Sequence, residues 1–341
     1  MGNDNSISKP LRIPKLWTKT HVRIRVLFLN ANTDRRLNGI EGKAHPHYLP
    51  SNRIPKITMQ VRLLLNEATI FCLCELEEDV CNQFAAEFAD CATKIVAYNT
   101  SKGAFHLLLI AHNPVTLANV KAYPLTKSGE SYPDAKRPTA LKPNEVPTAE
   151  YKEEVALYKK EILGDNFDKM VVGVSLTVNG ETIDVYFTHM GLSTEARMAQ
   201  TAKLVEIIKS RLPNKFVIIG DLNAFDPSVK VPALYKPQIE LIREGLSCAW
   251  LTEGVESTFE AYYFDIVFKL TEEERKKYFQ LKDENKIEEF RVFCLEMVAK
   301  YGTKGGPLDH AFASKELNAI ATVHPTEGLS DHAMIEVVFG N

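Results

Sequence analysis

The chain has 341 residues, of which 45% are hydrophobic and 25% charged, with a formal net charge of −3. This is ordinary globular composition, and at ~150 residues per domain it allows one large domain or two smaller ones. No apolar run reaches the ~18–20 residues that a membrane helix needs. The near-neutral charge also gives no support to nucleic-acid binding, which a strongly basic chain would favour.

The first twenty residues are polar and predict a flexible lead-in. The segment Met1-Gly2-Asn3-Asp4-Asn5-Ser6 matches the pattern for N-myristoylation. Basic residues such as Lys9 and Arg12 follow it, and one acyl chain plus a basic patch can hold a protein reversibly at a membrane. Weak membrane association through Gly2 is therefore the alternative to a plain polar terminus.

Six cysteines occur without any CxxC pair. This pattern predicts free or buried thiols in a reducing compartment rather than a structural zinc site. We therefore expect a cytoplasmic location, with peripheral membrane attachment as the alternative.

The first half of the chain predicts alternating strands and helices. A polar loop rich in Gly, Pro and His separates the first strand from the first helix. The expected elements are a strand over 22–29, a loop from Asn32 to Pro55, a helix from Ile57 to Asn66, a strand over 69–74, a helix over 77–91 and a strand over 105–111.

The second half opens with an aperiodic, Pro- and Lys-rich stretch over 122–147, which predicts an exposed insertion or lid. Asn179-Gly180 predicts a hairpin, and Thr271 with Glu274 predicts a capping box. The expected elements are a helix after Thr148, strands over 170–178 and 182–188, a helix over 195–211, a strand over 216–219, helix over 271–300, and strands over 311–314 and 333–339.

This alternation, with hairpins added, indicates an α/β architecture of mixed sheets covered by helices. We expect residues 21–341 to form a single domain with insertions at about 122–165 and 270–306.

Polar residues recur where the short apolar strands end or begin. Six positions on a rigid sheet can converge in this way, since the end of one strand can lie beside the start of its antiparallel neighbour. Hard oxygen donors at such a site suit Mg²⁺, and histidines near carboxylates suit acid and base catalysis. A lone residue of this kind is usually a turn or cap residue, so the prediction of a site depends on the whole set. The six positions are Asn30, Glu75, His189, Asp221 with Asn223, Asp309 with His310, and Asp331 with His332.

Several of these residues lie in recognisable motifs. The strongest are Gly220-Asp221-Leu222-Asn223 and Leu329-Ser330-Asp331-His332, with Ser257-Thr258-Phe259 and Pro307-Leu308-Asp309-His310 between them. On these motifs, residues 22–339 resemble the endonuclease/exonuclease/phosphatase superfamily, whose members are DNase I-like. The resemblance implies a four-layer α/β sandwich of two packed mixed β-sheets flanked by helices.

The resemblance also implies a role for each matching residue. Glu75 would be the principal Mg²⁺ ligand, helped by Asn30 and Asp331, with Mn²⁺ as a possible substitute. Asp221 would activate the attacking water, and Asn223 would donate to the phosphoryl oxygens. His332, oriented by Asp309, would contact the phosphate, and His189 would be the second catalytic histidine.

Two departures from the family pattern stand out. Cys74 replaces the Gln that usually precedes the ligand at Glu75, and Asn32 stands where some nucleases carry an Asp. We expect Asn32, Arg35 and Arg53 to bind substrate, since an Arg after the first motif can pair with phosphate. Plain surface charge is the alternative for both arginines.

Taken together, the motifs predict a monomeric, Mg²⁺-dependent phosphodiester hydrolase that attacks phosphorus with water. A nuclease acting on DNA or RNA is the leading expectation. A phosphoinositide phosphatase or sphingomyelinase-like enzyme is the alternative, and a non-catalytic binding module of the same fold is a further one.

Overall fold

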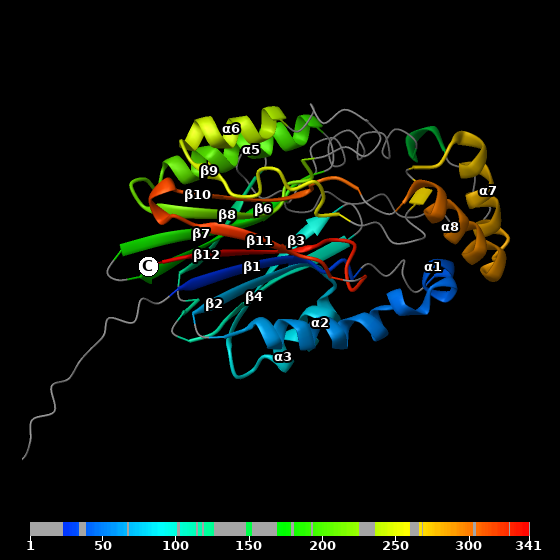
Figure 1. The fold of residues 1–341 in the computed structure, drawn as a ribbon, viewed down its shortest axis with the longest axis horizontal. Coiled ribbons are helices and arrows are strands. Elements are labelled where there is room, and N and C mark those ends of the chain that lie inside the picture. Colours follow the sequence, from blue (N-terminus) through cyan, green and yellow to red (C-terminus); the bar gives the residue numbers. More distant parts are fainter. Residues whose placement is uncertain are drawn as a thin grey trace, which may run out of the picture.

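Two mixed β-sheets form the centre of the molecule (Figure 1). The first contains, in spatial order, β11 (Ile320–His324), β12 (Met334–Phe339), β1 (Ile24–Asn30), β2 (Thr69–Leu76), β4 (Gly103–Ala111) and β3 (Ala92–Thr100). The second contains β5 (Val120–Pro124), β6 (Met170–Val178), β7 (Glu181–His189), β8 (Lys215–Asp221), β10 (Asp309–Ala313) and β9 (Ala249–Trp250). Each sheet has one parallel pair near its centre, β1 with β2 and β7 with β8.

This computed structural model describes residues 23–33, 39–66, 68–100, 103–113, 115–117, 119–125, 148–151, 169–178, 181–191, 194–224, 236–259, 266–267, 269–302, 305–326 and 328–340. The lipidation pattern at Gly2, the Asn179-Gly180 turn and residues 126–147 of the expected insertion lie outside them.

The main core lies between the two sheets. Alternate residues of β1 and β2, such as Phe28 and Ile70, pack in one cluster with residues of β7 and β8, such as Phe187 and Ile219. The intervening residues, such as Leu27 and Phe71, belong to a second cluster on the outer face. Both faces of the central strands are thus buried, which explains why these strands read as continuous apolar runs.

Helices cover the outer faces of both sheets (Figure 1). α2 (Pro50–Leu64) and α3 (Glu78–Glu87) pack on the first sheet, and α5 (Thr194–Lys209) and α6 (Lys236–Leu246) pack on the second. The expected four-layer sandwich is therefore confirmed. Among the described helices, none combines the length and the apolar character that crossing a membrane requires.

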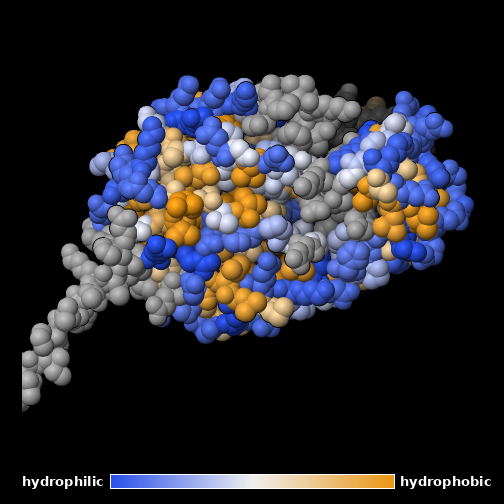
Figure 2. Space-filling model, in the orientation of Figure 1, coloured by the Kyte–Doolittle hydropathy of each residue, from blue (hydrophilic) through white to orange (hydrophobic). Residues whose placement is uncertain are grey.

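A further group of helices lies beside one end of the sandwich. α7 (Glu272–Asp283) and α8 (Ile287–Tyr301) share an apolar cluster with α1 (Ile40–Ala44) and the following 3₁₀ turn η2 (Pro46–Tyr48). The predicted capping box at Thr271 is present. Phe279, Val292 and Leu295 remain exposed on α7 and α8, and Figure 2 shows hydrophobic surface over this end of the molecule.

Some expected elements were wrong or missing. The loop expected from Asn32 to Pro55 contains α1, η2 and the first turns of α2. The helix begins at Pro50 because proline is well tolerated at the first helical position, where its missing N–H would be unpaired. The sequence reading also missed β3, β5, α6, β9, β11 and the 3₁₀ turn η6 (Lys315–Leu317).

Candidate active site

The polar residues predicted at strand ends lie together at one end of the two sheets, except His310, whose Nε2 donates to the carbonyl of Pro307 and whose ring packs near Trp250. His189 and Asp221 are register partners on β7 and β8, and Asp309 is the partner of Asp221 on β10. Asn30, at the end of β1, reaches across from the first sheet and donates from Nδ2 to Oδ2 of Asp221 at 3.1 Å. The convergence therefore depends on the packing of both sheets.

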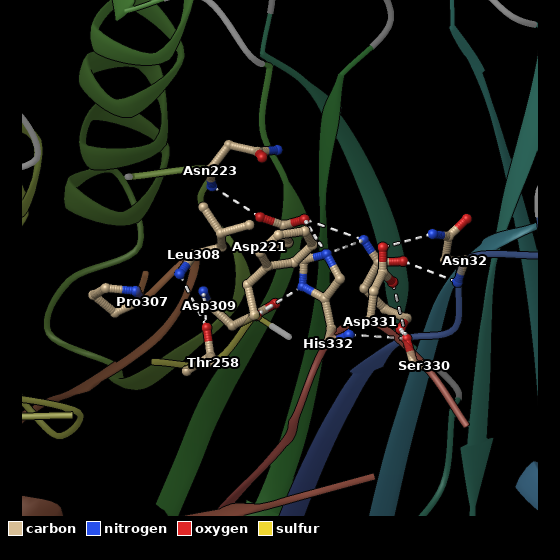
Figure 3. Close-up of polar contacts among 12 residues, drawn as sticks. Asn32, Asp221, Asn223, Thr258, Pro307, Leu308, Asp309, Ser330, Asp331 and His332 are labelled. Carbon is tan, nitrogen blue, oxygen red and sulfur yellow. Dashed lines mark hydrogen bonds and ion pairs between the residues drawn. The ribbon is translucent and has the colours of Figure 1, made fainter. Parts of the chain in front are cut away.

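His332 and Asp309 form a buried pair (Figure 3). The imidazole Nδ1 lies 2.8 Å from Oδ2 of Asp309, whose side chain is 0% exposed. The Oγ1 of Thr258 accepts hydrogen bonds from the backbone N–H groups of Leu308 and Asp309, at 2.9 and 2.8 Å. The ring of Phe259 packs edge-on against the imidazole, 5.3 Å between centroids. The Ser257-Thr258-Phe259 motif thus holds the pair in place.

Asp221 lies between the two histidines. Its Oδ2 is 3.9 Å from Nε2 of His332 and 3.6 Å from Nε2 of His189. Its Oδ1 accepts from the backbone N–H of Asn223 at 2.8 Å, and the Nδ2 of Asn223 donates to the carbonyl of Met190 at 2.9 Å. Asn223 has a positive φ of 47°, which Asn tolerates better than most residues. The Gly-Asp-Leu-Asn turn therefore orients its own carboxylate.

Glu75 projects from an irregularity in β2. The register of β2 against β4 shifts between Leu73 and Leu76, and Glu75 itself has a φ of 54°. Bulges of this kind re-aim a side chain, and a non-glycine residue in this region is strained. The Oε1 of Glu75 lies 3.4 Å from Nε2 of His189. Its side chain is 23% exposed, against 2% for Asp221, so Glu75 is the more accessible of the two carboxylates.

The remaining expected site residues, Asn30, Asn32 and Asp331, lie on the side of the first sheet. The Nδ2 of Asn32 donates to Oδ2 of Asp331 at 2.7 Å, and the backbone N–H of Asn32 donates to Oδ1 of Asn30 at 3.1 Å. The hydroxyl of Ser330 donates to the carbonyl of Asn30 at 2.5 Å. These bonds hold the first and last motifs against each other (Figure 3).

Arg53 does not lie where a substrate contact needs it. It is 0% exposed, and its guanidinium donates to the backbone carbonyls of Ala31, Asn32, Tyr48 and Leu329 at distances of 2.6–3.2 Å. The expectation of substrate binding is corrected to a structural role, because a buried guanidinium whose donors serve main-chain carbonyls cannot face a phosphate. Arg35 lies outside the described residues.

The pKa values of Asp221 and His332 are shifted for different reasons, and this gives the two groups different roles. Burial raises the pKa of Asp221 to about 6, although His332 opposes the shift. Burial lowers the pKa of His332, but Asp309 and then Asp221 outweigh it and hold that pKa well above its usual value. At neutral pH Asp221 is therefore an ionised base with a pKa near the working range, and His332 is a charged donor.

One group of described residues offers ligand atoms close enough for a cation: Asp221, Asp309 and His332, within 4.8 Å of one another. A protonated imidazole has no lone pair to give, and the Nδ1 of His332 already meets Asp309, so this trio suits proton chemistry better. The oxygen donors of Glu75, Asn30 and Asp331 fit a hard divalent cation better. Burial and then the charge of Asp331 raise the pKa of Glu75, against the effect of Lys169, so a cation would relieve this repulsion.

Two residues of the site escaped the sequence reading. Tyr98 on β3 places its hydroxyl 3.1 Å from Nδ1 of His189. Lys169 is buried just before β6, with its ammonium 5.7 Å from the Tyr98 ring centroid. Tyr98 lies in an apolar stretch, Ile95-Val96-Ala97-Tyr98, which could have indicated the missed strand, whereas nothing local marks Lys169.

A pocket of about 380 Å³ adjoins His332. Ser257, Phe259, Pro325 and Thr326 contribute to its walls. A larger cavity of about 650 Å³ surrounds Asp184 and Arg211 on another part of the second sheet. There the buried carboxylate already accepts bonds from Ser175, Arg211 and Asn214, so that cavity is built around a satisfied structural ion pair.

Sequence comparison finds no matching family model and no matching curated protein. Solved structures do match. An endonuclease/exonuclease/phosphatase from Bacteroides vulgatus aligns with TM-score 0.57 and 11% identity, over 94% of this chain and 100% of the other. A mannosyl-6-phosphatase from Bacteroides thetaiotaomicron gives 0.53 and 12%, over 92% and 98%. The human Nocturnin catalytic domain, with bound sulfate, gives 0.53 and 12%, over 95% and 98%. The chain therefore has the DNase I-like fold of endonuclease/exonuclease/phosphatase proteins, as its motifs indicated.

Proposed function

We propose that this protein is a Mg²⁺-dependent phosphoric ester hydrolase. The observation that carries the proposal is the meeting of a raised-pKa carboxylate, Asp221, with two histidines and the accessible carboxylate of Glu75. An oxygen-rich cation site beside a base and a charged donor is the apparatus for displacement at phosphorus. The shared fold with a mannosyl-6-phosphatase supports this class.

Each residue has a part that its position allows. Asp221 accepts the proton of the attacking water, and His332 donates to a phosphoryl oxygen as negative charge develops. His189 faces the same space, and its Nε2–H can donate a hydrogen bond to the leaving oxygen as negative charge develops there. Glu75, with Asn30 and Asp331, would hold Mg²⁺, which supplies charge neutralisation for the phosphate when bound.

A nucleic-acid phosphodiester is the substrate we expect first, on the motifs. The pocket beside His332 favours a second candidate, a compact phosphate ester such as a sugar phosphate or a lipid headgroup. A pocket of this volume accommodates a small group and adds apolar contact from Phe259.

The test is a substrate panel with and without EDTA. It contains a generic phosphodiester reporter, single-stranded DNA, RNA, a sugar 6-phosphate, phosphoinositides and sphingomyelin. We expect Mg²⁺-dependent turnover of at least one member, abolished in Glu75→Ala and His332→Ala. His324→Ala is the matched control, because His324 bonds to Glu336 on β12 and takes no part in the site. The third alternative, a non-catalytic binding module, survives only if no member of the panel is turned over.

A further inference from the structure

The hydroxyl of Tyr98 lies between two groups of the site. It accepts a hydrogen bond from the backbone N–H of Glu75 at 3.3 Å and lies 3.1 Å from Nδ1 of His189. The two rings meet edge to face, with centroids 6.0 Å apart and planes at 84°. Tyr98 belongs to the first sheet and His189 to the second, so this contact joins the two sheets.

The directions of these bonds assign the protons. Because the Glu75 amide can only donate, the Tyr98 oxygen is an acceptor there, and its own hydrogen is available for Nδ1 of His189. On the other edge of the imidazole, Nε2 faces two carboxylate oxygens, at 3.4 Å from Glu75 and 3.6 Å from Asp221. Ionised carboxylates only accept, so Nε2 must carry the hydrogen. In the neutral ring the Nε2 edge therefore requires the hydrogen on Nε2, and the Nδ1 edge fits this tautomer because the Tyr98 hydroxyl can donate there.

We propose that Tyr98 is a positioning residue, which holds His189 in the tautomer that carries its proton on Nε2 and aims that proton into the site. The catalytic consequence rests on the proposed function, because this N–H is the hydrogen-bond donor that His189 presents to the leaving oxygen. The opposite tautomer would point a lone pair at two carboxylates and offer no donor. Hydrogen-bond partners that fix the tautomer of a metal-bound histidine are commonly worth about 10–100-fold in activity, and we expect an effect of the same order for His189.

The surroundings keep Tyr98 in this geometry. Its side chain is buried, and its ring packs near Phe105, with centroids 6.3 Å apart. The Lys169 ammonium lies 5.7 Å from the centroid of the Tyr98 ring. The backbone N–H that binds the Tyr98 hydroxyl belongs to Glu75, so the irregularity in β2 that carries the Glu75 carboxylate also anchors Tyr98.

The test is ¹⁵N NMR of histidine-labelled protein without metal, at a pH where the imidazole is neutral. His189 is assigned from the signals lost in His189→Asn. We expect a single Nε2–H tautomer in the wild type, with a Tyr98 hydroxyl proton that shows coupling to Nδ1. Tyr98→Phe keeps the ring and should give mixed tautomers, with kcat lower by about 10–100-fold and KM changed little.

Tyr186→Phe is the matched control, because Tyr186 is equally buried and its hydroxyl bonds to Asp184 elsewhere on the sheet. It should leave the His189 signals and kcat unchanged. An Nδ1–H tautomer in the wild type overturns the proposal even if Tyr98→Phe does not fold, and so does an unaltered Nε2–H tautomer in a folded Tyr98→Phe. These readings need no substrate, so they stand apart from any failure of the proposed function.

Discussion

His189 and Asp221 are register partners at the final residues of two parallel strands, with 3.6 Å between Nε2 and Oδ2. One residue earlier, Thr188 is paired with Gly220. A Cβ atom on Gly220 would collide with the backbone of Thr188. The close approach of these strands, and with it the contact between the two catalytic candidates, therefore requires glycine at this position.

Gly220→Ala should lower the free energy of unfolding by about 3 kcal/mol, the upper end of the range for overpacking, because the clash is with backbone and not with a flexible side chain. It should also reduce turnover by displacing Asp221. Urea denaturation measures the first effect. Gly254→Ala is the control. A Cβ atom on Gly254 would meet open space, so this variant should lose only the ~1 kcal/mol of unfolding free energy that a non-glycine residue costs in the left-handed conformation. Equal losses in both variants would contradict the steric argument.

The activity should depend on the protonation of Asp221. Burial raises its pKa to about 6, so below that pH the carboxyl holds a proton and cannot accept one from water. We expect kcat/KM to rise about tenfold per pH unit below this pKa and to level off above it. A flat profile from about pH 7 down to about pH 5 would rule out Asp221 as the base.

Asp309→Asn should change the alkaline limb of the pH profile of kcat/KM. The negative charge of Asp309 opposes burial and keeps the pKa of His332 well above its usual value. Without that charge the pKa falls, so His332 loses its proton at a lower pH and the activity declines earlier as pH rises. The pH profile of kcat/KM in both proteins measures the shift. An unmoved alkaline limb would mean that His332 is not the charged donor.

Glu75→Gln should remove most of the cation affinity while the fold persists. An amide oxygen is a weaker ligand than a carboxylate, and the repulsion from Asp331 is also lost. Titration with Mn²⁺ followed by electron paramagnetic resonance should show weakening beyond the ~10–100-fold typical of residues outside the ligand set. Glu78→Gln, three residues along and exposed on α3, should bind as the wild type does. Unchanged affinity in Glu75→Gln would move the cation site elsewhere.

Arg53→Lys tests the structural role of that residue. A lysine ammonium cannot reproduce a guanidinium fork that serves four carbonyls, so we expect a loss of about 2–4 kcal/mol in unfolding free energy. The exposed pair of Arg62 with Asp90 provides the comparison, where Arg62→Lys should cost less than ~1 kcal/mol. If both variants lose less than ~1 kcal/mol of unfolding free energy, the structural role of Arg53 is wrong and substrate binding is again the better explanation.

The sequence by itself predicted the fold class and most residues of the candidate site. Each strand's apolar run and the polar residue at its end are adjacent in the chain, so Asp221, Asn223 and His332 could be identified locally. The Gly-Asp-Leu-Asn and Ser-Asp-His motifs also bring their own hydrogen bonds, such as Asn223 to Asp221 and His332 to Ser330.

Only the tertiary structure decided which of these residues act on one another. Tyr98 and His189 are 91 residues apart, and they meet because β3 and β7 belong to sheets that pack face to face. Arg53 has the positive charge that could bind a phosphate, but it is buried beneath the first and last motifs, where its guanidinium donates to main-chain carbonyls. Which strands are neighbours, and what a side chain is buried against, depends on long-range packing that no local pattern records.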